Sequence, residues 1–115
     1  MFPMPTPHLP SIAVRRALKK LGSDLREARL RRGLPADVVA SRAFTTRPTL
    51  RRIEAGDPGV GIGIYAAVLQ AMDMLDGVAA LADPVNDKTG QLLSAAALPE
   101  RARIKRRKTN ARENG

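Results

Sequence analysis

The stretch TTRPTLRRIE, residues 45–54, brings guanidinium groups and hydroxyls together within ten residues. If this stretch is helical, Leu50 and Ile53 share one side because they are three positions apart. The opposite and flanking positions hold Arg47, Pro48, Thr49, Arg51 and Arg52. A guanidinium fork donates two hydrogen bonds at once to a phosphate, a carboxylate or the O6 and N7 atoms of guanine. We therefore expect a helix that buries two aliphatic side chains and presents arginines to an acidic surface.

Two kinds of contact are expected from these residues if that acidic surface is a nucleic acid. The candidates for facing the bases are Arg47, Pro48, Arg51 and Arg52. The candidates for holding phosphates are Thr46, Thr49 and Arg42, since hydroxyls, guanidinium groups and the free amides of a helix start suit phosphate oxygens. The simpler alternative is a solvent-exposed basic helix, because arginine is a good helix former.

Charge is segregated along the chain, whose 115 residues carry a net charge of +9. Residues 1–56 hold twelve basic and four acidic side chains, residues 57–99 hold one and five, and residues 100–115 hold seven and two. A basic front half favours a polyanionic partner. A stacking platform for single-stranded RNA is disfavoured, because the only aromatic residues are Phe2, Phe44 and Tyr65. We expect double-stranded DNA, with a general basic nucleic-acid-binding protein as the alternative.

Hydrophobic periodicity predicts five helices. The first begins after an N-cap at Ser11 and ends at Gly33, and Gly22 and Ser23 mark a place where it can bend. The others are expected at 36–43, 47–55, 62–72 and 75–82, with Thr46 as an N-cap and Gly56 as a left-handed C-cap. The second and third helices nearly abut, which is the spacing of a helix-turn-helix.

The fold class is therefore expected to be all-α, with extended tails. Residues 1–10 are proline-rich and predict an N-terminal tail, and residues 11–82 form the expected DNA-binding domain. Residues 83–100 are a short extension with a weaker helical stretch at 90–97. The basic segment 101–115 is too polar to fold.

The segment 62–72 is apolar on two sides, so it needs two packing partners. One partner is the core of the domain, and the other is expected to be a second copy of the chain. The candidate dimer or partner surface consists of Tyr65, Val68, Leu69, Met72, Met74 and Leu75. Core packing is the alternative for the methionines.

Several function classes are disfavoured by composition. The chain has no cysteine and a single histidine, His8, which leaves almost nothing for a metal site, thiol catalysis or histidine acid–base chemistry. We expect no enzyme activity, no cofactor and no metal. No apolar run approaches the roughly 20 residues of a membrane span, so we expect no membrane partner and a cytoplasmic, nucleoid-associated location.

The segment LREARLRRGLPADVVASRAFTTRPTLRRIEAGDPGV resembles the repressor/Cro-type helix-turn-helix domain of bacterial and phage regulators, the Xre family, from Leu21 to about Leu81. The resemblance implies a five-helix domain whose third helix enters the major groove and which binds palindromic operators as a homodimer. It implies base-facing roles for Arg47, Pro48, Arg51 and Arg52 and a phosphate contact for Thr49. It also implies a structural ion pair between Arg29 and Glu54.

The chain departs from this family at three positions. Pro35 and Ala36 stand where the family has a polar cap and a glutamine that touches the DNA backbone or steadies the third helix. Phe44 stands at the turn glycine, so either an aromatic residue adopts a left-handed conformation or the turn is rearranged.

The second half, GDPGVGIGIYAAVLQAMDMLDGVAALADPVNDKTGQLL with LPERARIKRRK, is similar to HipB-like antitoxins encoded beside HipA-type kinases. This similarity implies a kinase toxin as a second partner, bound by the acidic and apolar surface beyond the third helix. It also implies repression of the operon that encodes both proteins. A stand-alone transcriptional regulator is the alternative.

Overall fold

The computed structural model describes residues 9–97. All regular secondary structure in this range is helical, which confirms the expected fold class. The chain divides in sequence into two compact units, with the boundary between Val78 and Ala79. Most of the expected proline-rich tail, and the basic segment from residue 101 onward, lie outside the described residues.

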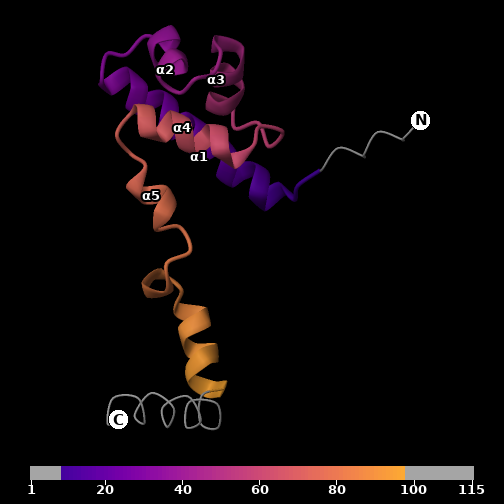
Figure 1. The fold of residues 1–115 in the computed structure, drawn as a ribbon. Coiled ribbons are helices and arrows are strands. Elements are labelled where there is room, and N and C mark those ends of the chain that lie inside the picture. Colours follow the sequence, from indigo (N-terminus) through magenta and orange to yellow (C-terminus); the bar gives the residue numbers. More distant parts are fainter. Residues whose placement is uncertain (1–8, 98–115) are drawn as a thin grey trace, which may run out of the picture. The chain divides into compact units, whose positions relative to one another are not determined.

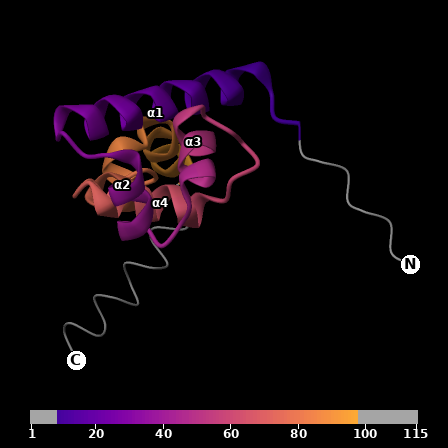
Figure 2. The same cartoon turned by 90° about the horizontal axis from the view of Figure 1, so that it is seen from above.

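Four helices build the first unit (Figure 1). They are α1 (Ile12–Arg31), α2 (Ala36–Arg42), α3 (Arg47–Glu54) and α4 (Ile62–Ala71). The closest helix pairs are α1 with α3, α2 with α3, and α2 with α4. Seen from above, α2, α3 and α4 lie on one side of α1 (Figure 2). The long first helix therefore serves as the support against which the short α3 is held.

The ends of these helices follow from local chemistry. The Oγ atom of Ser11 accepts a hydrogen bond from the Val14 amide at 3.2 Å, and Oγ1 of Thr46 accepts one from the Thr49 amide at 3.3 Å. Each bond satisfies a backbone donor that the first turn leaves free. Gly33 and Gly56 have φ angles of 61° and 75°. The predicted caps are thus confirmed at both ends of α1 and α3.

Helix α1 continues through Gly22 without interruption. Gly22 is buried, and a Cβ atom added there would lie 2.5 Å from the carbonyl oxygen of Ile53. A Cβ atom on Gly56 would lie 2.5 Å from the carbonyl oxygen of Leu18. Both glycines are needed because the backbone at the end of α3 lies directly against the backbone of α1.

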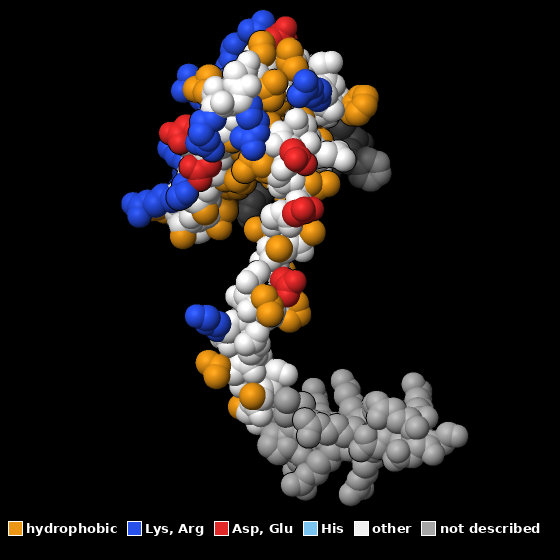
Figure 3. Space-filling view, turned by 90° about the vertical axis from the view of Figure 1, so that its left-hand side faces the viewer, with side chains coloured by type: hydrophobic (Ala, Val, Ile, Leu, Met, Phe, Trp, Pro, Cys, Tyr) orange, Lys and Arg blue, Asp and Glu red, His pale blue; other side chains and the backbone are white. Residues whose placement is uncertain are grey.

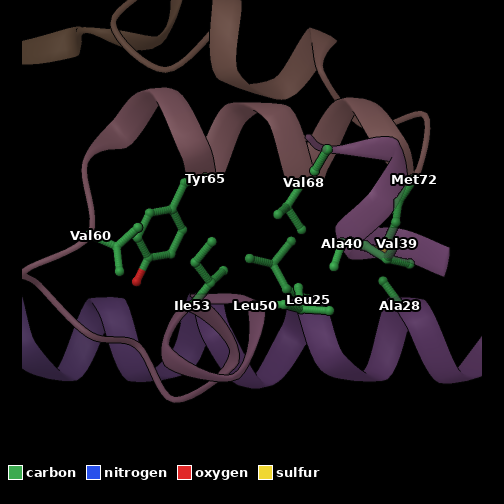
Figure 4. Packing of buried hydrophobic residues seen from close by; sticks show 11 residues of the cluster. Leu25, Ala28, Val39, Ala40, Leu50, Ile53, Val60, Tyr65, Val68 and Met72 are labelled. Carbon is green, nitrogen blue, oxygen red and sulfur yellow. The ribbon is translucent and has the colours of Figure 1, made fainter. Parts of the chain in front are cut away.

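The core lies between α4 and the other three helices, and Figure 4 shows Tyr65 and Val68 of α4, and Met72 directly after it, pointing towards the core. Its buried residues are Leu25, Ala28, Val39, Ala40, Ala43, Leu50, Ile53, Val60, Tyr65, Val68 and Met72. The sequence placed Tyr65, Val68 and Met72 on a candidate partner surface. That assignment is wrong for these three residues, because all three are buried in the core of the domain. A domain this small needs the apolar side of α4 to complete its core.

The fifth helix is shorter than predicted, whereas the weaker helical stretch expected at 90–97 is slightly longer. Helix α5 covers only Asp76–Ala79 instead of 75–82, and it has no buried residue. A four-residue helix without burial gains too little to extend, and Gly77 lowers its helix propensity further. A 3-10 turn, Pro84–Asn86, and a helical stretch at 88–97 follow. The carboxylates of Asp83 and Asp87 accept hydrogen bonds from the amides of Val85 and Gly90, each at 2.9 Å.

An ion pair closes the contact between α1 and α3. Arg29 Nε donates to Glu54 Oε2 at 2.7 Å and Nη2 donates to Oε1 at 3.1 Å, while Nη1 donates to the Leu34 carbonyl at 3.1 Å. The two side chains are 11% and 10% exposed. The hydrogen bond to Glu54 raises the pKa of Arg29 above its ordinary value. The pair that the family resemblance implied is therefore present, and it is bidentate.

Among residues 9–97, no helix combines the length and the apolar character that crossing a bilayer requires.

Replacing Arg29 by alanine should lower the free energy of unfolding by about 3–5 kcal/mol, because the mostly buried Glu54 would lose its ion-pair partner. Urea unfolding followed by circular dichroism measures this loss. Lys20→Ala is the matched control, since its pair with Asp24 is exposed on the same helix and its removal should leave stability nearly unchanged. Equal effects of the two substitutions would contradict the structural role of the buried pair.

Candidate nucleic-acid interface

A tight turn joins α2 to α3. The Phe44 amide donates to the Ser41 carbonyl at 3.1 Å, and the Thr45 amide donates to the Ala40 carbonyl at 2.9 Å. Phe44 has a φ angle of 55° and is 97% exposed. Of the two expected alternatives, the aromatic residue takes the left-handed conformation and the turn is kept. The two short helices therefore form the helix-turn-helix that their spacing predicted.

Helix α3 is anchored on one side and bare on the other. Leu50 and Ile53 are 1% and 0% exposed. The side chains that face solvent are Arg47, Pro48, Arg51 and Arg52. Figure 3 shows lysine and arginine side chains gathered over the surface of the first unit. The division of α3 into an aliphatic anchor and an arginine row, expected from the helical wheel, is thus present.

Arg47 and Arg51 form no ion pair within residues 9–97. The ion pairs within the described part of the chain involve other cations and leave both without a carboxylate partner. Both side chains are exposed, and they lie one helical turn apart on α3. They are therefore available to an external acceptor.

Arg52, in contrast, forms an ion pair with Asp57 in the loop that follows α3. Its Nε atom donates to Oδ2 of Asp57 at 2.7 Å, and the Gly59 amide donates to Oδ1 of the same carboxylate at 2.7 Å. These bonds, chiefly the one from Arg52, lower the pKa of Asp57 below its ordinary value. A carboxylate with a lowered pKa keeps its pair as the pH falls through the usual aspartate range and loses it only below that range. Arg52 is exposed, but its guanidinium group is oriented by the loop.

The loop that holds Arg52 is itself fixed by α4. The hydroxyl of Tyr65 donates to the Asp57 carbonyl at 2.9 Å, and burial raises the pKa of that hydroxyl. Sequence reasoning missed both roles of Asp57 and the hydrogen bond of Tyr65, which it placed on the candidate dimer or partner surface. The Asp-Pro-Gly sequence was a usable signal, because an aspartate that begins a turn commonly accepts a hydrogen bond from the amide two residues on.

The start of α3 offers fewer free donors than expected. Pro48 has no amide hydrogen, the Thr49 amide is capped by Thr46, and the Leu50 amide bonds the Thr46 carbonyl at 2.9 Å. Thr46 Oγ1 also donates to Thr49 Oγ1 at 3.1 Å. The Thr49 hydroxyl can therefore still donate to a phosphate oxygen, whereas the expected row of free amides is absent from this end.

The remaining expected contacts are spread over α2 and the segment after α4. Arg42 is exposed in the last turn of α2, and Pro35 caps that helix without a side-chain hydrogen bond. Leu69 is half-buried against the core. Met74 and Leu75 are 37% and 39% exposed, so they are the members of the candidate partner surface that face solvent. Within residues 9–97, no three His, Cys, Asp or Glu side chains gather as metal ligands would.

Comparison with protein families matches residues 20–82, more than half of the chain, to the helix-turn-helix domain. No curated protein and no solved structure matches the chain. The matched range begins in α1 and includes the turn at Phe44 and the arginine row of α3. The chain therefore belongs to the helix-turn-helix domain family of DNA-binding proteins.

Proposed function

We propose that this protein is a sequence-specific transcriptional repressor that binds its operator as a homodimer. The observation that carries the proposal is the arginine row on α3, which Leu50 and Ile53 hold outward on a helix-turn-helix. Arg47 and Arg51 are free to form bidentate contacts with guanine in the major groove, the commonest specific contact of that kind. The Thr49 hydroxyl and the exposed Arg42 at the end of α2 would contact the DNA backbone.

The proposal of a dimer is supported by apolar side chains that the first unit leaves exposed. Ile62 and Ile64 on α4 are 72% and 39% exposed, and Met74 and Leu75 follow the same helix. A second copy that packs against these side chains would bury them. To bind a palindromic operator, the dimer must present its two arginine rows about 34 Å apart, one turn of DNA.

Replacing Arg51 by glutamine should weaken operator binding by about 1–3 kcal/mol, the value of one bidentate base contact. Fluorescence anisotropy with DNA from upstream of the protein's own gene measures the loss, with a scrambled duplex of equal length and composition beside it. Arg16→Gln, an exposed arginine in the first half of α1, removes the same charge elsewhere. Equal binding of the wild-type protein to both duplexes would overturn sequence-specific recognition.

The contact between Asp57 and Arg52 yields a separate prediction. If Asp57 orients Arg52 for DNA, Asp57→Ala should reduce the preference for operator over scrambled DNA as much as Arg52→Ala does. The double variant should then lose no more than either single one, because both remove the same oriented fork. The loop would instead hold Arg52 away from the DNA if the losses of the two single variants add in the double variant. A stronger preference of Asp57→Ala for operator over scrambled DNA would mean the same.

A second candidate function is that of an antitoxin that binds a kinase toxin and represses the operon encoding both. It is favoured by the second unit, where Leu81, Val85, Leu92 and Leu93 are between 67% and 75% exposed. A helical stretch with this much uncovered apolar surface suits a protein partner. The acidic excess of residues 57–99 distinguishes this region from the basic front half, so the two partners would not compete for one surface.

Co-purification with the product of the adjacent gene tests the antitoxin role. Changing Leu92 and Leu93 together to aspartate should abolish co-purification, whereas Ser94→Asp, in the same exposed helical stretch, should preserve it. Operator binding should survive both changes. If the product of the adjacent gene is unrelated to kinases and does not co-purify, the antitoxin role is refuted. The protein would then be a stand-alone regulator.

A further inference from the structure

We infer that a cavity between α1 and α3 is a binding site for a phosphate oxyanion, with Arg26 as its key residue. The cavity has a volume of about 210 Å³. Arg26 and Arg29 line it from α1, and Arg47, Arg51 and Glu54 line it from α3. The inference concerns the site itself and depends on the proposed DNA binding only for the source of the phosphate.

The charge of this cavity is not balanced from within. Glu54 is its only carboxylate, and both of its oxygens accept hydrogen bonds from Arg29. The third nitrogen of Arg29 donates a hydrogen bond to the Leu34 carbonyl. Because the charges of Arg29 and Glu54 cancel, this ion pair neither attracts nor repels a charged ligand strongly. The other three guanidinium groups, from Arg26, Arg47 and Arg51, have no ion-pair partner within residues 9–97. The lining therefore carries three uncompensated positive charges around a concave surface, where mutual repulsion favours an anion.

The arrangement of the arginines favours phosphate over carboxylate. A carboxylate is planar and is matched by a single fork, whereas the oxygens of a phosphate point in different directions. Here the forks come from two different helices that line the cavity, with Arg26 on α1 and Arg47 and Arg51 one turn apart on α3. Such a group can receive one oxygen from each direction.

Two sources can supply the phosphate. One is the DNA backbone beside the groove that α3 enters. The other is a free phosphate-bearing small molecule. In the first case Arg26 extends the interface from α3 to α1, and at least one of Arg47 and Arg51 holds the backbone instead of a base. Sequence reasoning did not single out Arg26, although its position three residues before Arg29 was a signal that both face the same side.

The test measures arginine Nε–Hε resonances by NMR during titration with inorganic phosphate, with acetate and chloride at matched ionic strength as controls. Phosphate should shift the resonances of Arg26, Arg47 and Arg51 and leave that of Arg31 in place. Arg31 is an exposed arginine of the same helix, about 140° around it from Arg26. In Arg26→Gln the shifts at Arg47 and Arg51 should fade, whereas Arg26→Lys should keep part of them.

DNA binding at several salt concentrations then identifies the source. If the backbone supplies the phosphate, Arg26→Gln should weaken binding to operator and scrambled duplexes alike and reduce the slope of log K against log salt by about 0.9. Arg31→Gln should leave the slope unchanged. Phosphate-induced shifts without a change of slope identify a small phosphate-bearing ligand.

The site is overturned if phosphate shifts Arg31 as much as Arg26, if acetate acts equally well, or if Arg31→Gln reduces the slope as much as Arg26→Gln. Failure of the wild-type protein to bind any DNA would refute the proposed function alone, because the phosphate titration needs no DNA. Circular dichroism of Arg26→Gln establishes that the variant is folded, as expected for an exposed side chain.

Discussion

The contact between α1 and the end of α3 is the constraint on which the rest of the first unit depends. Helix α3 has only eight residues, too few to be stable in water without tertiary packing. Ile53 is fully buried, and Glu54 next to it is held by two hydrogen bonds from Arg29. The aliphatic anchor supplies the stabilisation. The ion pair adds geometric specificity, because its two parallel hydrogen bonds fix the guanidinium group and the carboxylate relative to each other.

The aliphatic anchor and the ion pair together explain why a short helix can carry several arginines. Arginines on one face repel one another, and their repulsion opposes folding. The helix nevertheless forms because its opposite face is held by the core, its start is capped by Thr46, and its last turn is joined to the loop through Asp57. The buried anchor and the exposed arginine row are therefore built from opposite faces of the same eight-residue helix.

Features of this fold that depend on neighbouring residues could be predicted from the sequence. Features that depend on contacts between distant parts of the chain could not. Ser11, Thr46, Gly33 and Gly56 act at the positions where short-range rules place them, because a cap depends on its own turn. The choice between the two apolar stripes of α4 could not be made, since both have helical spacing and only the core decides which one is buried. Likewise, the bond between Arg52 and Asp57 depends on the path of a loop. The cavity beside Arg26 depends on the separation of two helices far apart in the sequence.

The backbone contact at Gly22 and Gly56 has a consequence for how such a protein can diverge. The distance between α1 and α3 is limited by the absence of a Cβ atom at Gly22 and Gly56, and not by side chains that can repack. A larger residue at either position would clash with backbone atoms and push α3 away from α1. In a symmetric assembly the displacement would occur twice, once in each copy. Divergence in DNA preference is therefore expected to proceed through the outward side chains, while the spacing between helix and support stays constant.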